Sequence, residues 1–283
     1  MIRSTERVGL PVFNASALLD LIKKLVVLDR RWIPTKEGYS LYVRPTLIGT
    51  SPGLAVATPT SATLFVILSP TGPYFPSGFK PITLLAEYTY VRSWPGGTGE
   101  YKLGLNYTPC FRPQEEAAKK GYQQILWILG EERKITEVGQ MNFFIVVKRD
   151  DGDVDLMTPV LGWDNSAWCD AGLGIRLAAL LPALPALSQF ASAPGFPSKI
   201  HVRETVITVP RLLEFSQAGL LLEAFGSGTA AIVAPVSVIG YEGHDITLPV
   251  YEGGAGPVAS ATYNALVAIQ DGRVECEGWC VRC

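Results

Sequence analysis

The chain has 283 residues, of which 48% are hydrophobic and 18% charged, so it has material for a sizeable core and is globular. Its 24 basic and 26 acidic residues leave a net charge of -2 without a basic block, which excludes the electrostatic footprint of a nucleic-acid or anionic-membrane binder. No apolar run reaches the roughly 18 residues needed to span a bilayer, and the residues after Met1 lack a signal-peptide core. We therefore expect a small-molecule partner, with no nucleic acid and no membrane.

Five cysteines, three of them at Cys276, Cys280 and Cys283, raise the question of a metal clip or a disulfide framework. A structural zinc needs about four ligands, and His201 and His244 show no metal-site spacing with these cysteines. We therefore expect no metal and free thiols in a reducing compartment, either the cytoplasm or the mitochondrion.

The first part of the chain predicts one helix and two strands. Apolar residues recur at helical spacing in residues 14–31, and either Asn14 or Ser16 can cap this helix. Residues 41–43 and 63–68 are short apolar or β-branched runs bounded by Pro and Gly, which is typical of strands.

The rest of the chain mixes helices and strands irregularly, which favours an α+β fold. We expect a small domain at residues 1–75, an interdomain linker at 76–90 and a large domain at 91–283. In the large domain the patterns predict helices at 114–122, 210–217 and 258–269, strands at 124–129 and 230–239, and a hairpin of 141–147 with 154–157.

A lysine among small residues is followed by a carboxylate at the end of an apolar run. Residues 100–107 (EYKLGLNY) contain Lys102, and residues 134–143 (KITEVGQMNF) contain Glu137. Pyridoxal phosphate chemistry requires this pair, because an amine forms a Schiff base with the cofactor aldehyde and a carboxylate keeps the pyridine nitrogen protonated. Taken alone, the lysine would be an ordinary surface residue and the glutamate a cap or turn residue.

In this order the two motifs resemble those of the branched-chain amino acid aminotransferases, which are fold-type IV pyridoxal phosphate enzymes. The resemblance extends over nearly the whole chain except residues 162–196, and it implies a two-domain fold-type IV architecture whose small N-terminal domain is truncated. Further matching segments are residues 40–45 (SLYVRP), 68–75 (LSPTGPYF), 123–127 (QQILW) and 225–230 (FGSGTA).

The resemblance also implies roles for single residues on the cofactor side of the site. Lys102 would be the catalytic residue that binds pyridoxal 5'-phosphate and shuttles the α-proton. Tyr107 would bond the phenolic oxygen of the cofactor, and Glu137 its ring nitrogen. Gly228 and Thr229 would hold the phosphate, because N–H groups at a turn form a pocket for an anion.

On the substrate side the resemblance implies contacts from Arg44, Tyr74, Thr229 and Ala230. The reaction it implies is transfer of an amino group from leucine, isoleucine or valine to 2-oxoglutarate, in the biosynthesis or catabolism of branched-chain amino acids. The implied assembly is a homodimer, and the implied partners are amino acids and 2-oxo acids.

Two other functions remain open from the sequence. A sister fold-type IV enzyme, such as a D-amino acid aminotransferase or an aminodeoxychorismate lyase, would use the same lysine and carboxylate, although the signature at residues 137–142 favours the branched-chain group. A non-enzymatic alternative is a catalytically inert remnant that pairs with an intact subunit.

The chain departs from the family pattern in two places. The alignment reaches Met1 in mid-domain, so we expect the opening strands and a phosphate-binding arginine to be absent. Residues 161–172 stand where the family has a phosphate-binding loop. Codons that can encode these residues can also encode the expected loop when they are read one nucleotide later. We therefore predict that residues 162–196 come from a shifted reading frame or a misplaced intron boundary, the alternative being a diverged insertion. Both departures predict impaired activity.

Overall fold

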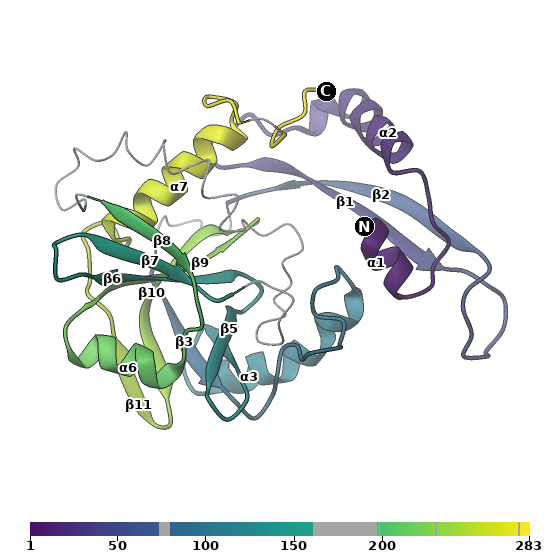
Figure 1. Ribbon diagram of the computed structural model, residues 1–283. Coiled ribbons are helices and arrows are strands. Elements are labelled where there is room, and N and C mark those ends of the chain that lie inside the picture. Colours follow the sequence, from purple (N-terminus) through teal and green to yellow (C-terminus); the bar gives the residue numbers. More distant parts are fainter. Residues whose placement is uncertain (74–79, 161–196, 198, 230, 277) are drawn as a thin grey trace. The chain divides into compact units, whose positions relative to one another are not determined.

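The computed structural model describes residues 1–73, 80–160, 197, 199–229, 231–276 and 278–283 (Figure 1). The chain forms two compact units, Met1–Pro76 with Val281–Cys283, and Ser77–Cys280. No helix in these described ranges has the length and apolar character needed to cross a membrane.

The first unit is built on a two-stranded antiparallel ribbon. Its strands run in register from Ser40 opposite Thr71 to Gly49 opposite Ala62, and both are longer than the sequence predicted. The predicted helix is confirmed, and Asn14 rather than Ser16 caps it, because the Asn14 side chain accepts a hydrogen bond from Ala17 N at 3.0 Å. The elements of this unit are α1 (Ile2–Arg7), α2 (Ala15–Leu28), a 3-10 helix (Arg30–Trp32), β1 (Ser40–Gly49) and β2 (Ala62–Thr71).

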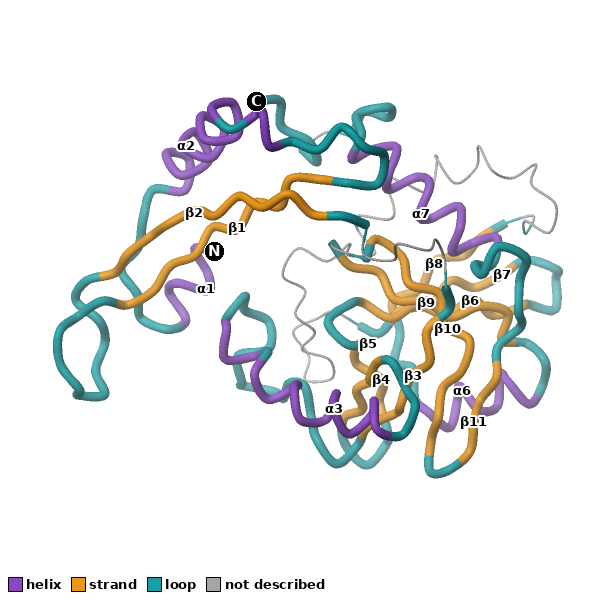
Figure 2. Tube along the Cα trace, turned by 180° about the vertical axis from the view of Figure 1, so that it is seen from behind, coloured by secondary structure: helices purple, strands orange, loops and turns teal. Residues whose placement is uncertain are grey.

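In the second unit the described strands form a mixed sheet in the order β5-β4-β3-β10-β9-β6-β7-β8, with β11 paired to β10 (Figure 2). The β3–β4, β3–β10 and β7–β8 pairs are parallel and the other pairs antiparallel. Its elements are β3 (Ile82–Glu87), α3 (Phe111–Lys119), β4 (Gln124–Leu129), β5 (Lys134–Val138), β6 (Asn142–Lys148), β7 (Val154–Thr158), β8 (Ile200–Glu204), α6 (Val209–Gln217), β9 (Leu221–Gly228), β10 (Ile232–Tyr241), β11 (His244–Thr247) and α7 (Pro257–Gln270).

The sequence assigned residues 76–90 to a linker, whereas the structure places β3 there. Ile82, Leu84 and Ala86 alternate with more exposed neighbours and are at most 5% exposed, as in a strand packed on one face. The predicted linker therefore contains a strand of the second unit, paired on both sides with β4 and β10.

The other predicted elements of the second unit are confirmed as α3, α6, α7, β4, β10 and the β6–β7 hairpin. The mixture of parallel and antiparallel pairs agrees with the expected α+β class. Sequence reasoning did not find β5, β8, β9 and β11. In β5 the polar residues Lys134, Thr136 and Glu137 interrupt the apolar pattern that identifies a strand.

Strand β6 lies in the core and is covered on both faces. Phe144 and Val146 pack in a cluster with Val258 and Leu266 of α7, and the Phe144 ring stacks on Phe225 with the ring centroids 5.2 Å apart. The alternate residues of β6 are also buried and point to the opposite face. Figure 1 shows α7 and α6 on opposite sides of these strands, which explains the continuous apolar run.

A buried glutamate from β9 caps the start of α7. The Glu223 carboxylate accepts hydrogen bonds from Val258 N and Ala259 N, each at 2.9 Å. Gly256 stands at the helix cap, and a Cβ there would meet the Glu223 carboxyl carbon at 2.2 Å. Burial raises the pKa of Glu223 to about 7, although the two backbone N–H bonds act to lower it.

We predict that Glu223→Gln destabilises the protein more at pH 5 than at pH 8. Because the folded pKa lies above the ordinary value of 4.5, the folded state binds this proton more tightly than the unfolded state does. The protonated carboxyl group of Glu223 therefore stabilises the folded state at low pH, and this stabilisation is lost as the pH rises through about 7. The difference in unfolding free energy between wild type and variant should fall by roughly 2–3 kcal/mol from pH 5 to pH 8 in urea titrations.

The matched control is Glu115→Gln, on the exposed surface of α3, for which we expect a small effect at both pH values. A Glu223→Gln effect that grows with pH would show that the two N–H donors hold the carboxyl group ionised instead.

Candidate active site

Lys102 lies in the connection between β3 and α3, just before two short 3-10 helices, Gly104–Asn106 and Thr108–Cys110. The Asn106 side chain is 6% exposed and donates to Thr98 O at 2.8 Å and to Tyr101 O at 2.7 Å. It also accepts a hydrogen bond from the Thr98 hydroxyl at 2.8 Å. These side-chain bonds fix the backbone on both sides of Lys102.

The amine of Lys102 is directed at the side chain of Tyr107. Its Nζ donates a hydrogen bond to the Tyr107 hydroxyl and lies 4.8 Å from the centroid of the tyrosine ring. Lys102 is exposed and Tyr107 is half-buried. The amine is therefore accessible to a small molecule and already hydrogen-bonded to a phenol.

Glu137 is buried on β5, beside a buried arginine. Glu137 is 1% exposed, and Arg92 is 5% exposed. Arg92 Nε lies 3.3 Å from Glu137 Oε1, and Arg92 Cζ lies 5.4 Å from the centroid of the Tyr107 ring. The structure therefore brings three of the predicted cofactor residues, Lys102, Tyr107 and Glu137, into one contiguous group through Arg92.

The position of Glu137 is fixed by the turn that follows it. Trp127 lies opposite Glu137 in the β4–β5 pair, and its indole donates to Gly139 O at 2.9 Å. Val138 and Met141 exchange backbone hydrogen bonds of 3.0 and 2.8 Å across the turn. Gly139 has φ +58°, and a Cβ there would meet the Gln124 side chain at 2.6 Å, so this turn requires glycine.

The predicted anion-binding residues lie at the end of β9, where Gly228 is the last residue of the strand and Thr229 follows it. Gly228 pairs with Ile232, whose φ of 59° is strained for a β-branched residue. The buried Ser227 hydroxyl donates to Ile232 O at 2.7 Å and holds this conformation, while Thr229 is exposed. A Cβ on Gly228 would lie 3.0 Å from Met141 Cγ, so this turn packs on the turn that follows Glu137.

Two residues of this group were missed by sequence reasoning, Arg92 and Cys110. Cys110 is 7% exposed, and burial raises the pKa of its thiol, with a lowering contribution from Arg92 and a raising one from Glu137. Its Sγ donates to Asn106 O at 3.5 Å. The signal for Arg92 was a single cation inside residues 91–94 (VRSW), directly before the glycine-rich turn.

Of the predicted substrate residues that the structure describes, Arg44 belongs to the first unit and Thr229 to the second. Arg44 lies on β1 of the first unit, where its guanidinium donates to the Tyr42 hydroxyl at 3.4 Å and its Cζ is 5.0 Å from that ring's centroid. Tyr74 and Ala230 lie outside the described residues, and so does the segment 162–196 with its hypothesised frame shift. Their roles stay predictions.

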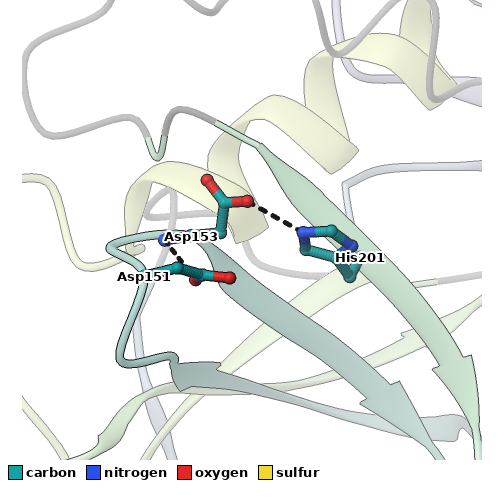
Figure 3. Close-up of side chains that lie close together, drawn as sticks. All are labelled: Asp151, Asp153 and His201. Atoms are coloured by element: carbon teal, nitrogen blue, oxygen red, sulfur yellow. Dashed lines mark hydrogen bonds and ion pairs between the residues drawn. The ribbon is translucent and has the colours of Figure 1, made fainter.

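His201 is brought to two carboxylates that are far from it in the sequence. Figure 3 shows Asp151 and Asp153, at the tip of the β6–β7 hairpin, beside His201 of β8. One ligand atom from each of these three residues lies within 4.8 Å of the others. His201 Nε2 is 2.8 Å from Asp153 Oδ2, and Asp153 N donates to Asp151 Oδ1 at 3.1 Å.

An arginine already neutralises part of this cluster. Arg149 donates to both carboxylate oxygens of Asp151, at 2.9 to 3.1 Å, and its hydrogen bond lowers the pKa of Asp151 to about 2. Arg149 and Arg203 also bond the same oxygen of Asp155, at 3.2 and 2.9 Å. We interpret the cluster as a charge network that joins β7, β8 and the hairpin. The four described cysteines are free thiols.

The group around Lys102 fits pyridoxal phosphate by the chemistry of its donors. An accessible amine can bind an aldehyde, a phenol can bond the oxygen beside it, and a carboxylate paired with a cation can hold a protonated pyridine nitrogen. The donor chemistry of this group is therefore that of a pyridoxal phosphate site.

Comparison with known proteins extends this assignment. Residues 1–239 match the family model described as "Amino-transferase class IV". The branched-chain-amino-acid aminotransferase of Dictyostelium discoideum is 42% identical over 281 residues, which are 99% of this chain and 70% of that protein. The cytosolic enzyme of the same name from Mus musculus is 42% identical over 276 residues, 97% of this chain and 67% of that protein.

Solved structures agree on the fold. The branched-chain aminotransferase of Thermoproteus uzoniensis with norvaline has a TM-score of 0.68 at 23% identity, over 96% of this chain and 77% of that one. The Escherichia coli branched-chain aminotransferase has a TM-score of 0.67 at 24% identity, over 98% of this chain and 79% of that one. The chain belongs to the class IV aminotransferase family, and the resemblance found in its sequence is confirmed.

We predict that Ser227→Ala lowers the unfolding free energy by about 1 kcal/mol or more, because the Ile232 carbonyl loses its donor and the strained turn loses its restraint. Chemical denaturation measures this change. Ser237→Ala is the matched control, since the Ser237 hydroxyl makes a longer contact of 3.4 Å to Ile82 O on the neighbouring strand. Equal losses for the two variants would contradict the restraining role of Ser227.

Proposed function

We propose that this protein catalyses pyridoxal phosphate-dependent transamination between branched-chain L-amino acids and 2-oxoglutarate. The observation that carries the proposal is the contiguous group of Lys102, Tyr107, Arg92 and Glu137. This group occurs in a chain that is 42% identical to named branched-chain aminotransferases over 99% of its length. Amino-group transfer needs both an amine that binds the cofactor and a carboxylate that keeps its ring protonated.

The residues of this group have distinct tasks in this proposal. The bound cofactor supplies an aldehyde and a protonated ring that withdraws electrons. Lys102 would hold the cofactor through Nζ, and once the substrate amine has displaced it there, the freed Nζ would take the proton from the substrate α-carbon and return it. The Tyr107 hydroxyl would bond the phenolic oxygen of the cofactor, a role that its position beside the Lys102 amine supports. The Glu137 carboxylate holds the proton on the ring nitrogen.

The remaining predicted residues bind anions and the substrate. Gly228 and Thr229 would hold the phosphate with backbone N–H groups, a role that their position on a tight turn supports. Arg44, Tyr74 and Ala230 would contact the substrate, with Thr229 shared between the two groups. An apolar pocket discriminates among branched side chains weakly, by about 1–3 kcal/mol per methylene.

The proposal also covers the oligomeric state and the cellular compartment of the protein. We expect a homodimer, which light scattering on the purified chain would test. Relatives include proteins named as cytosolic and as mitochondrial, such as the two from Saccharomyces cerevisiae. We expect one of these two compartments for this protein.

The test is to add pyridoxal phosphate to the full chain, reduce with borohydride and locate the modified residue by peptide mass. We expect the adduct on Lys102. A panel of amino donors should then give transfer with leucine, isoleucine and valine. Transfer with D-alanine in their place would indicate a D-amino acid aminotransferase, and release of pyruvate from aminodeoxychorismate the lyase. No adduct on any lysine would favour an inert remnant.

We predict that Lys102→Met removes the adduct and lowers amino transfer by about 100-fold or more, because Nζ both binds the cofactor and moves the proton. Lys134→Met is the matched control, a lysine on β5 whose Nζ pairs with Glu132 at 2.8 Å. An adduct that persists in Lys102→Met and disappears in Lys134→Met would contradict the assignment.

A further inference from the structure

Arg92 is a full positive charge without access to water. Its side chain is 0% exposed, and that of its partner Glu137 is 2% exposed, with Nε and Oε1 3.3 Å apart. Removing two charges from water costs several kcal/mol for each, and their attraction repays this cost only in part. Stability alone therefore gives a weak reason for this pair, which suggests a role in the chemistry of the site.

Another buried glutamate shows what happens without such a cation. Glu223 is 5% exposed, and its carboxylate bonds two backbone N–H groups. Its pKa is raised to about 7, since burial disfavours the charged form more than these bonds favour it. Arg92 gives Glu137 a positive charge within 4 Å, whereas among the described residues no ion pair is formed by Glu223.

Arg92 also reaches the other side of the group. Its Cζ lies 5.4 Å from the centroid of the Tyr107 ring, and the Nζ of Lys102 lies 4.8 Å from the same centroid. The position of Arg92 is therefore defined both by the carboxylate and by the aromatic ring. A residue held at two points can hold its partner in a fixed direction.

We propose that Arg92 is a positioning residue that keeps Glu137 ionised and aimed for the protonated ring nitrogen of the cofactor. The cofactor part of this inference rests on the proposed function, whereas the effect of Arg92 on the charge of Glu137 is a property of the protein alone. Arg92 acts through Glu137, so that removing either residue removes the same effect.

The first experiment uses the cofactor-free chain and four proteins, wild type, Arg92→Met, Glu137→Gln and the double variant. In Arg92→Met the buried carboxylate loses the cation that lies 3.3 Å away, so it should take up a proton near neutral pH, and this protein should lose stability as the pH rises from 6 to 9. The double variant has no carboxylate there and should not share this loss. Wild type and Glu137→Gln should differ by the same amount at both pH values.

The second experiment uses the same four proteins loaded with pyridoxal phosphate. We expect Arg92→Met to retain the adduct on Lys102, to shift the visible absorption of the bound cofactor and to slow α-proton exchange of leucine by about 100-fold. Glu137→Gln should show the same shift and loss, and the double variant should be no slower than Glu137→Gln alone. Arg92→Lys keeps the charge and should recover part of the rate.

The matched control is Arg133→Met, since Arg133 also lies over a tyrosine, 4.2 Å from the Tyr88 ring centroid, and pairs with Glu242 at 3.8 Å. This group is exposed to solvent, and its loss should leave the absorption and the exchange rate unchanged.

Two outcomes would overturn the inference. One is an additive loss in the double variant, which would mean that Arg92 acts independently of Glu137. The other is an Arg92→Met protein whose stability relative to the double variant does not depend on pH. An absent adduct in wild type would instead reject the proposed function and would leave the first experiment valid.

Discussion

The ion pair between Arg92 and Glu137 ties together parts of the second unit that local structure leaves separate. Arg92 follows β3 and Glu137 lies on β5, and β4 lies between these strands in the sheet. The pair therefore connects the irregular segment that carries Lys102 to the edge of the sheet. Because both charges are removed from water, a displacement of either side chain would leave a buried charge uncompensated. This constraint keeps the amine, the phenol and the carboxylate together.

The two buried glutamates among the described residues, Glu223 and Glu137, have different surroundings. Glu223 caps α7 from a neighbouring strand, and burial favours its protonated form near neutral pH. Glu137 has a cation instead, which suits a carboxylate that must be negative to hold a proton elsewhere. The surrounding sheet supplies a rigid support, whereas the proposed chemistry lies on the connections at its ends. The tight turns there depend on glycine at Gly139 and on the Ser227 hydrogen bond.

Elements with a strong local pattern were predictable from the sequence. The helix α2 has its capping asparagine and its apolar spacing, and β4 has an uninterrupted apolar run. β3 was assigned to a linker because it is short and follows Pro81, although its burial comes from pairing with β4 and β10. β5 was missed because a glutamate in a short segment predicts a solvent-exposed loop. Its burial can be explained only when the arginine that pairs with its charge is known.

The sequence by itself determined the family and the fold class, and it selected Lys102, Tyr107 and Glu137 as candidate site residues, because these depend on motifs of neighbouring residues. Only the tertiary structure decided that Arg92 pairs with Glu137 and that His201 meets Asp153, which is 48 residues away. Such contacts are set by the order of strands in the sheet, and no local periodicity encodes that order. The charge of a buried carboxylate likewise depends on what the fold places beside it.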